Sequence, residues 1–329
     1  MRRFILQGTY YELGWSLGQK LQAMKLRISG VSAEKREFYR ECEAEVERCF
    51  PAIVEWMQGL SDGMNVDRDA AAAFILTAGV STHGCTVFAS TGTETGEPIV
   101  GRNFDASYSS APDCGVYMTS PNSSLKSLAN SEIIGMGDDG VNEAGLFVGV
   151  TCVATEVKPG AHVSLLVRGV LEKCSTVKQG VRYLLDSTPL EGANYLLADA
   201  SGKMAVVEAS PKVSRVRWPV DDWIVATNHF VHPEMQSQEK LSRRWADSEI
   251  RLREISNQLM KAEIVTVEMC KDILSSHDHS ICCHEDEKQI GTLWSLVAMP
   301  RSRRFLLASG HPCSKPYIAQ NQLSRSISI

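Results

Sequence analysis

The first 80 residues carry apolar side chains at the three- and four-residue spacing of amphipathic helices. The stretch "YYELGWSLGQKLQAMKLRI" has this spacing, and "SAEKREFYRECEAEVERCF" repeats it until Pro51 breaks or restarts the pattern. The pattern continues in "PAIVEWMQGLSDGM" and then in "DRDAAAAFILTAGV", where Asp67 or Asp69 is the expected N-cap. We therefore predict a helical segment from residue 1 to about residue 80.

The pattern changes at Cys85 to short apolar runs separated by Gly, Asn and Asp, which is typical of strands and turns. Two of the turns close hairpins, one before "IVGRNFD" and one at Ser201-Gly202, and "GVNEAG" marks a third turn. Two amphipathic helices follow the first group of strands, and two more precede the last strand pair. The predicted strands are 85–90, 99–105, 131–137, 146–154, 194–200, 203–210, 222–228, 292–300 and 303–309, and the predicted helices are 163–174, 176–187, about 240–261 and 265–275.

This order of elements favours two sheets enclosed between two helical layers. We predict an α+β fold, a four-layer αββα sandwich, with the helical N-terminal segment beside it. No internal repeat, low-complexity stretch or linker divides the chain.

Composition narrows the class of protein further. The 329 residues are 43% hydrophobic and 22% charged with a net charge of −5, which describes a globular protein and argues against a nucleic-acid partner. No apolar run reaches the roughly 20 residues of a membrane span, and "MRRFILQG" is too short for a signal peptide. We expect a cytoplasmic protein without a membrane partner.

Ten cysteines are present, an unusual number for a chain with no secretory signal. Most are expected to be reduced core residues instead of a disulfide framework. They are Cys42, Cys49, Cys85, Cys114, Cys152, Cys174, Cys270, Cys282, Cys283 and Cys313.

The pair Gly84-Cys85 lies where the helical pattern ends and the strand pattern begins. A buried structural cysteine, a metal ligand and the start of a new chain all explain it. An N-terminal cysteine carries its own base, because its α-amine has a pKa of about 7.7–8 and can take the thiol proton. The thiol could expose that amine by attacking the preceding carbonyl, and glycine leaves this carbonyl sterically open and tolerates strain.

Four other residues in distant stretches have side chains suited to such a site. In "GRNFD", Arg102 would favour a thiolate and Asp105 would hold the new ammonium, although a strand places them on opposite faces and a surface ion pair is the alternative. Asn228 in "ATNHF" could donate to an oxyanion or serve as a turn residue. Arg251 shares a helix face with Ser248 in "DSEIR", as a site residue or as solvated charge.

Together these stretches resemble the acyl-coenzyme A:6-aminopenicillanic acid acyltransferase family of N-terminal-nucleophile hydrolases, with bile salt hydrolases and penicillin V acylases as more distant relatives. The resemblance extends from "GTYYELGWSLGQ" through "HGCTVFA", "GRNFD", "GVNEAGLFVGV", "ATNHF", "DSEIR", "SICCHEDE" and "TLWSLVAMP" to "ASGHPC". The order and spacing of these motifs carry it, since no single motif is specific. "NFDA" departs from the family by lacking the aromatic residue that often follows the aspartate.

The resemblance implies a role for each matching residue. Cys85 is the autocatalytic nucleophile, Arg102 and Asp105 are the charged pair, and Asn228 is an oxyanion donor. A backbone N–H at Thr151, within one residue, is the second oxyanion donor. Arg251 matches the arginine of the "DSxxR" motif, with Arg243 and Arg244 as competing matches.

The resemblance also implies self-cleavage between Gly84 and Cys85. The products would be a pro-segment of residues 1–84 and a catalytic chain of residues 85–329, which stay associated. His83 is placed to assist this cleavage or to act as a turn residue.

The stretch "SSHDHSICCHED" offers a competing zinc site. Against zinc, the paired cysteines lack the two-residue loop of tetrahedral sites, and the acyltransferase family has a similar stretch without a required metal. The candidate ligands are His277, His279, Cys282, Cys283 and His284.

The sequence thus predicts a cysteine enzyme that cleaves a small N-acyl amide or an acyl thioester through an acyl-enzyme on Cys85, without a cofactor. The alternatives are an acyl-coenzyme A-dependent N-acyltransferase, an uncleaved binding or storage protein, and a zinc protein built on residues 277–284. Hydrolysis is preferred, because transfer to an amine requires a site that excludes water. A homo-oligomer is compatible with the sequence.

Overall fold

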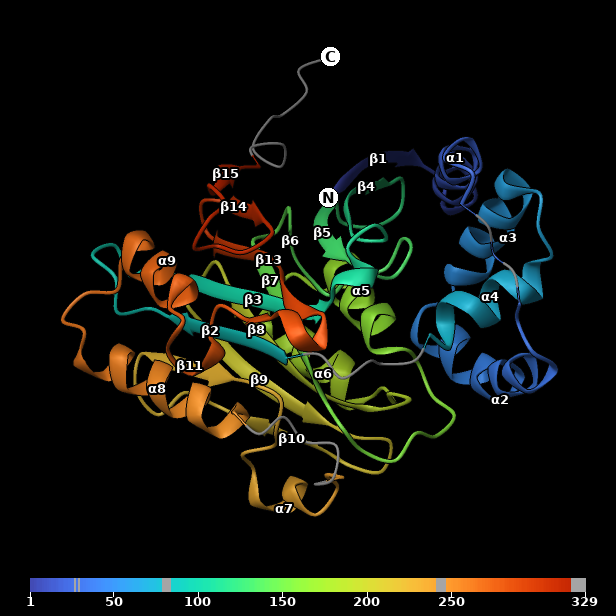
Figure 1. The fold of residues 1–329 in the computed structure, drawn as a ribbon. Helices are drawn as coiled ribbons and strands as arrows, with labels where there is room; N and C mark the ends of the chain where they lie inside the picture. The colour runs from blue at the N-terminus through green and yellow to red at the C-terminus, as the bar shows by residue number, and fades with distance from the viewer. Residues whose placement is uncertain (27, 29, 79–83, 241–246, 321–329) are drawn as a thin grey trace.

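The computed structural model describes residues 1–26, 28, 30–78, 84–240 and 247–320, and these residues form two stacked β-sheets between helices (Figure 1). One sheet has the strand order β1-β4-β5-β6-β7-β8-β9-β10, and the other has the order β11-β2-β3-β13-β14-β15 with β12 beside β13. The predicted four-layer αββα arrangement is confirmed. No helix of the described residues combines the length and the apolar character that crossing a membrane requires.

Strand β1 (Arg2–Gly8) corrects the prediction that the N-terminal segment is wholly helical. It pairs in parallel with β4 (Gly115–Pro121), so the first sheet contains residues from both sides of Gly84-Cys85. The physical reason is a period of two, since Phe4 and Leu6 are buried while Ile5 between them is exposed. The strand is short and α1 begins directly after it, so the alternation is hard to distinguish from the helical spacing in the sequence.

Four helices then follow as predicted: α1 (Tyr10–Ala23), α2 (Ala33–Cys49), α3 (Ile53–Met64) and α4 (Arg68–Leu76). Helix α1 begins with a capping box between Thr9 and Glu12. Asp67 is the N-cap of α4, where its side chain accepts from the Ala70 amide. Pro51 separates α2 from α3, so it restarts the helical pattern.

The first sheet has apolar side chains on both faces. Alternate residues of β7 (Leu146–Val153) divide between them, because Leu146 and Val148 pack in the core under the helices while Phe147 packs in the core between the sheets. Helices α5 (Val163–Lys173) and α6 (Val177–Leu185) cover the outer face together with α1–α4. The remaining strands are β5 (Ser127–Ser131), β6 (Asp139–Asn142), β8 (Gly192–Asp199), β9 (Met204–Ala209) and β10 (Ser214–Arg217).

The prediction of a strand over 131–137 is wrong. Residues 132–138 form a loop, in which Asp138 accepts from the Glu132 amide and the Ser131 hydroxyl and Gly135 has a φ of 66°. The strand β6 instead begins directly after this loop, in the segment "DGVN" (Asp139–Asn142). Apolar residues of the loop are buried by the helices above it, so the run looks like a strand without pairing as one.

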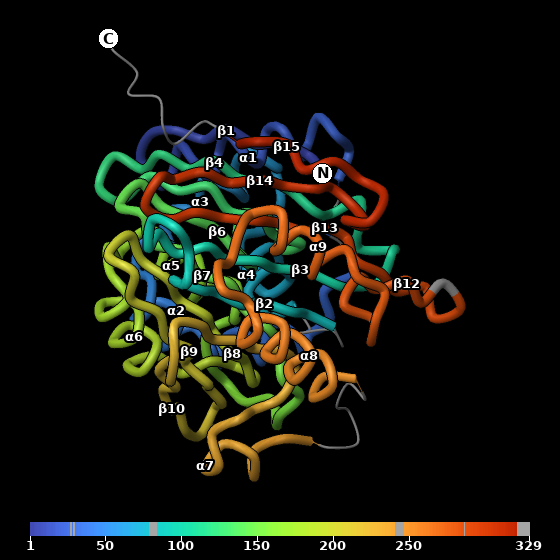
Figure 2. Tube along the Cα trace, turned by 90° about the vertical axis from the view of Figure 1, so that its left-hand side faces the viewer, coloured from blue at the N-terminus to red at the C-terminus, as the bar shows by residue number. Residues whose placement is uncertain are grey.

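The second sheet carries the outer helices α8 (Ser248–Lys261) and α9 (Val267–Ser275), which lie in front of its strands in Figure 2. Here too the residues alternate: Val87 faces the other sheet and Phe88 faces α8 and α9. A short helix, α7 (Pro233–Gln236), precedes α8. The strands are β2 (Gly84–Ser90), β3 (Ile99–Ser107), β11 (Trp223–Ala226), β12 (His284–Glu285), β13 (Ile290–Met299), β14 (Arg304–Ser309) and β15 (Ile318–Ala319).

Helices α1 and α3 touch backbone to backbone through glycines. A Cβ atom on Gly59 would lie 2.0 Å from the Tyr11 carbonyl oxygen, and one on Gly14 would lie 2.0 Å from the Trp56 carbonyl oxygen. Such contacts require the two helices to move apart before any side chain fits. The N-terminal helical layer therefore depends on these two positions.

Replacing Gly59 by Ala should destabilise the protein, although the same change stabilises an isolated helix. We expect the free energy of unfolding to fall by about 1–3 kcal/mol, measured by urea denaturation. The control is Gln58→Ala on the exposed side of α3, with an expected change within about 0.5 kcal/mol. Equal stability of the two variants would contradict this packing.

Candidate active site

Cys85 is the second residue of β2 and is fully buried, with 0% of its surface exposed. Strand β3 runs antiparallel beside it, with Gly84 opposite Asp105 and Cys85 opposite Phe104. The thiol points into the core between the two sheets. The peptide bond before Cys85 thus lies at the end of a central strand. It adjoins residues 79–83, including His83, which lie outside the described part of the chain.

Two side chains from other elements hold the backbone of Cys85. The Cys85 N–H donates to Asn228 Oδ1 at 2.7 Å, and the Cys85 carbonyl accepts from an Arg251 guanidinium nitrogen at 2.7 Å. The same guanidinium donates to Thr86 Oγ1 and to Asn228 Oδ1, at 2.7 and 2.9 Å. Asn228 follows β11, and Arg251 is in the first turn of α8, so the end of one strand and the start of one helix meet at this peptide.

Arg251 determines the orientation of the Asn228 amide. A guanidinium has only donors, so the Asn228 oxygen must face it and the amide nitrogen must face the other way. The nitrogen donates to the Cys152 carbonyl at 3.0 Å, and the Asn228 backbone N–H donates to Ser248 Oγ at 2.8 Å. The side chain is therefore fixed at both ends.

Arg102 lies on β3 with its side chain completely buried between the sheets. Its Nε donates to Asp139 Oδ2 at 2.6 Å, and Asp139 also accepts from Trp294 Nε1 and Asn130 Nδ2. One guanidinium nitrogen has no hydrogen-bond partner among the described residues. The positive charge lowers the pKa of the Cys85 thiol, so Arg102 acts from the side of the first sheet.

Asp105 faces the opposite side of the sheet, toward α8. Its carboxylate accepts from Thr292 Oγ1 at 2.6 Å, and burial raises its pKa to about 7, although the Arg251 charge and the Thr292 hydrogen bond lower it. The Asp105 backbone also hydrogen-bonds the Cys85 sulfur. A register shift between Thr292 and Trp294 of β13 lies opposite this position.

Arg102 and Asp105 therefore approach Cys85 from opposite faces of β3, at the point where β2 begins. Arg102 does so across the core, and Asp105 does so through its backbone and its position opposite Gly84. Burial raises the pKa of the Cys85 thiol to about 12, and this effect outweighs the lowering by Arg102, Arg251 and the Asp105 backbone. With its chain continuous, as in this structure, Cys85 thus has a protonated thiol at neutral pH.

Thr151, the expected backbone donor, is buried in β7 opposite Asn194. Its hydroxyl donates to the Thr227 carbonyl and accepts from Asn194 Nδ2 at 3.2 Å. The next residue, Cys152, is the one whose carbonyl meets the Asn228 amide. Strand β7 thus passes beside the site at residues 151 and 152.

Sequence reasoning missed Asp139 and Thr292, which hold Arg102 and Asp105. Asp139 directly precedes the quoted "GVNEAG" stretch. A buried arginine at position 102 requires a carboxylate partner, and this requirement is the signal that could have directed attention to Asp139. Arg243 and Arg244, the competing matches to Arg251, lie outside the described residues.

The competing zinc cluster is rearranged by the fold. The structure brings together His277, Cys282 and His284 and adds Cys313, while His279 and Cys283 are not in the group. Cys283 instead hydrogen-bonds through its backbone with Thr292.

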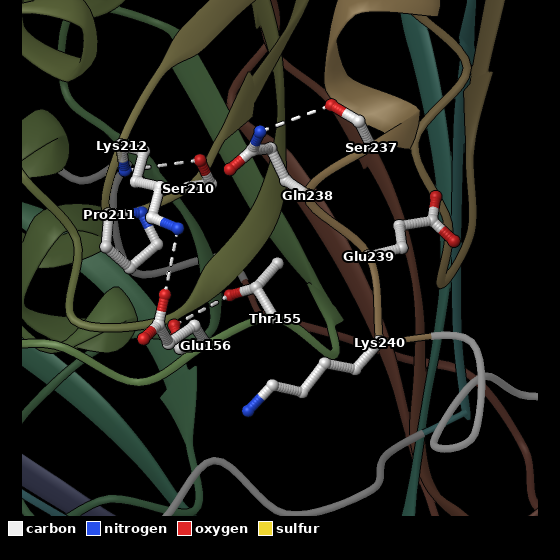
Figure 3. A pocket seen from close by; sticks show the side chains of 9 residues that line it. All are labelled: Thr155, Glu156, Ser210, Pro211, Lys212, Ser237, Gln238, Glu239 and Lys240. Carbon is white, nitrogen blue, oxygen red and sulfur yellow. Dashed lines mark hydrogen bonds and ion pairs between the residues drawn. The ribbon is translucent and has the colours of Figure 1, made fainter.

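A polar pocket of about 310 Å³ lies beyond the end of β7 (Figure 3). Lys212 extends to Glu156 across it at 2.9 Å, and the Lys240 backbone donates to the Ala154 carbonyl. None of the predicted site residues lines this pocket. Its lining residues are Thr155, Glu156, Ser210, Pro211, Lys212, Ser237, Gln238, Glu239 and Lys240.

The arrangement around Cys85 suits nucleophilic chemistry at a carbonyl. A buried sulfur lies beside a buried cation, and the amide nitrogen of the same residue already has a fixed acceptor in Asn228. Buried polar groups of this kind are kept in place by their neighbours before any reaction begins.

Comparison with known proteins identifies related chains and folds. The family model of acyl-coenzyme A:6-aminopenicillanic acid acyl-transferase matches residues 92–313, more than half of the chain, beginning after Cys85. Two variants of the conjugated bile acid hydrolase from Clostridium perfringens match with TM-scores of 0.55 and 0.54 and identities of 14% and 15%, each covering 72% of this chain and 93% of its own. An N-acylethanolamine-hydrolyzing acid amidase ortholog from Caenorhabditis elegans has a TM-score of 0.49 and 15% identity, covering 66% of this chain and 93% of its own. No curated protein matches the chain in sequence.

The raised pKa of Asp105 predicts a pH-dependent loss of stability. The folded protein, with a pKa of about 7 against an ordinary value of 3.8, binds more protons than the unfolded chain between these values. Stability contributed by the neutral carboxyl is therefore complete below about pH 4 and lost as the pH rises to about 7. We compare the Cys85→Ala protein with and without Asp105→Asn. Across this pH range the free energy of unfolding of the double variant should rise by up to about 4 kcal/mol relative to that of Cys85→Ala alone.

The measurement is urea denaturation of both proteins at several pH values. Their difference in unfolding free energy should be small near pH 4 and reach a plateau above about pH 7. A difference that grows as the pH falls would contradict the raised pKa of Asp105.

Proposed function

Because the chain belongs to the acyl-coenzyme A:6-aminopenicillanic acid acyl-transferase family, we propose that it is a self-processing enzyme that uses Cys85 as an N-terminal nucleophile. Its fold is that of the N-terminal-nucleophile hydrolases, in which acyl groups are cleaved from amides or transferred. The proposed substrate is a small N-acyl amide or an acyl thioester. The single observation that carries the proposal is that Asn228 accepts from the Cys85 N–H while Arg251 donates to the Cys85 carbonyl.

The first reaction is cleavage of the Gly84–Cys85 bond. The Cys85 sulfur attacks the Gly84 carbonyl carbon, the C–N bond breaks, and the thiol proton passes to the departing nitrogen. Water then hydrolyses the thioester, leaving a Gly84 carboxylate and a free thiol. Asp105 lies opposite Gly84, and its pKa of about 7 lets it accept and return a proton at neutral pH.

The second reaction uses the amine that cleavage releases. Asn228 Oδ1 already accepts from the Cys85 nitrogen, so the new α-amine stays next to the sulfur and takes its proton. Burial of Cys85 raises the pKa of its thiol, and cleavage opens the chain at this residue. The raising effect of burial is then reduced, and the Arg102 charge favours the thiolate. The thiolate attacks the substrate carbonyl carbon and the amine protonates the leaving group.

The oxyanion formed in this step requires hydrogen-bond donors. Asn228 supplies its side-chain amide, and β7 supplies a backbone N–H at or next to Thr151, because both lie beside Cys152. Donors fixed before the reaction stabilise the developing charge more than mobile ones. The acyl-enzyme is then resolved by water or by an amine.

Hydrolysis is the preferred outcome, with acyl transfer from acyl-coenzyme A as the second. The family name supports transfer, since it pairs an acyl-coenzyme A with an amine acceptor. An assay of N-acyl amides and acyl thioesters, with and without acceptor amines, separates the two outcomes. No cofactor takes part in either.

Intact-mass measurement of the purified protein tests self-processing. We expect chains of 84 and 329 − 84 = 245 residues, the second beginning Cys-Thr-Val, and a single 329-residue chain for Cys85→Ala. Cys270→Ala is the matched control, because Cys270 is equally buried but lies in α9, in the core between that helix and the second sheet, and this variant should cleave normally. An active wild-type enzyme with one continuous chain would refute the proposal.

Arg251→Lys should impair both processing and turnover. A lysine has one ammonium nitrogen in place of the two guanidinium nitrogens that separately donate to the Cys85 carbonyl and to Asn228 Oδ1. It cannot reproduce both bonds with the same geometry, so the amide loses its fixed orientation. We expect kcat/KM to fall about 100-fold, equivalent to about 2.7 kcal/mol. Arg253→Lys, on the exposed side of the same helix, should leave the rate unchanged, and equal rates in both variants would remove Arg251 from the site.

A further inference from the structure

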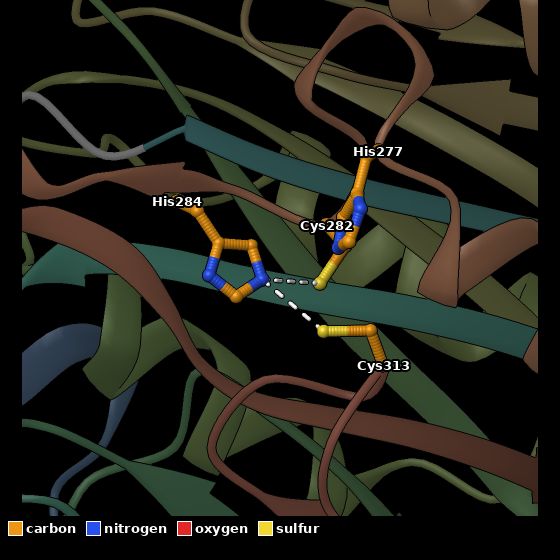
Figure 4. Close-up of side chains that lie close together, drawn as sticks. All are labelled: His277, Cys282, His284 and Cys313. Carbon is orange, nitrogen blue, oxygen red and sulfur yellow. Dashed lines mark hydrogen bonds between the residues drawn. The ribbon is translucent and has the colours of Figure 1, made fainter.

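Two histidines and two cysteines meet on the surface near the second sheet (Figure 4). We call His277, Cys282, His284 and Cys313 the Cys/His cluster, and one potential ligand atom of each lies within 4.8 Å of the others. His284 Nε2 is 3.3 Å from Cys282 Sγ and 3.2 Å from Cys313 Sγ. The His277 and His284 rings meet edge to face with centroids 5.0 Å apart.

The backbone is bent to bring these side chains together. His279 and Ser280 have φ values of 55° and 58°, a left-handed conformation that side chains other than glycine rarely adopt. This turn reverses the chain between His277 and Cys282, and the Cys282 N–H closes it by donating to the Ser276 carbonyl at 2.7 Å. Cys313 arrives separately, from the loop after β14.

We propose that the Cys/His cluster binds one zinc ion in a tetrahedral site. Zinc takes sulfur ligands at about 2.3 Å and imidazole nitrogens at about 2.0–2.1 Å, so a sulfur and a nitrogen on the same ion lie roughly 3.5 Å apart. The sulfur–nitrogen distances of 3.3 Å and 3.2 Å in the structure are close to this separation. Two thiolates and two neutral imidazoles form a ligand set that structural zinc sites use.

Binding would release the two thiol protons to solvent and leave a site with no net charge. A disulfide between Cys282 and Cys313 is the competing use of the same sulfurs. Against it, His284 Nε2 contacts both sulfurs at once, which a metal site requires and a disulfide does not. The His277 ring would likewise have no part in a disulfide.

The bound ion would brace the segment that supports Asp105. Cys283 follows a cluster ligand and exchanges two hydrogen bonds with Thr292, from its N–H to Thr292 Oγ1 at 2.9 Å and from Thr292 N–H to its carbonyl at 3.1 Å. Thr292 Oγ1 in turn donates to Asp105 Oδ1 at 2.6 Å. The cluster thus fastens the loop after β14 to the segment behind Asp105, and its zinc binding does not depend on acyl transfer.

The test is metal analysis of the full-length protein after purification without chelator and exposure to zinc, followed by gel filtration. We expect about one zinc per chain for the wild type and less than about one tenth for Cys313→Ser and for His284→Asn. His279→Asn is the matched control, since His279 lies within the same turn but outside the cluster and Asn tolerates its left-handed backbone. It should keep its zinc.

Replacing zinc by cobalt reports the coordination geometry of the Cys/His cluster through visible absorption. The experiment uses the wild type, so it does not depend on the folding of any variant. Chelator-treated wild type that keeps its circular dichroism should bind cobalt with the intense visible absorption and sulfur charge-transfer bands of a tetrahedral thiolate site. A wild type that takes up no zinc or cobalt overturns the proposal. A chain lighter by the mass of two hydrogens and linked between Cys282 and Cys313, or zinc lost from His279→Asn but kept by Cys313→Ser, also overturns it.

Discussion

One buried guanidinium organises the peptide around Cys85. Arg251 extends from α8 to the start of β2 and donates to the Cys85 backbone carbonyl and to the side-chain oxygen of Asn228. Leaving a buried charge without one of its hydrogen-bond partners costs folding free energy. The acceptors of Arg251 are therefore held in the arrangement that satisfies its guanidinium. The acceptor at the Cys85 nitrogen, the orientation of the Asn228 amide and the contact with β7 all follow from it.

A second buried guanidinium acts from the other side of the same strands. Arg102 is paired with Asp139 across the interface between the sheets, so its charge is fixed within the core beside the thiol. The two arginines do different work. Arg251 holds the backbone of Cys85, whereas Arg102 acts on its sulfur. Strand alternation places Arg102 on the face of β3 toward the first sheet and Asp105 on the other face.

The sequence predicted those features that local patterns encode. Helical spacing located α1–α4. The separate motifs "ATNHF" and "DSEIR" pointed to Asn228 and Arg251, which the fold brings to Cys85. It failed where distant packing decides. Ile134 and Met136 of the loop 132–138 are apolar because helices cover them, and β1 is a strand because β4 is available to pair with it. Cys313 joins the Cys/His cluster from a distant loop that no spacing rule connects to the other three residues.

The shared core of the two halves bears on how the molecule can fold. Leu6 and Leu17 from before Gly84 pack in one cluster with Val148 and Leu166 from after it, and β1 is hydrogen-bonded to β4. While the chain is continuous, forming this core is a unimolecular event. Under the proposed cleavage of the Gly84–Cys85 bond it would become a bimolecular event that depends on concentration. A cleaved molecule that unfolds in dilute solution would then lack the covalent tether that first brought its two parts together.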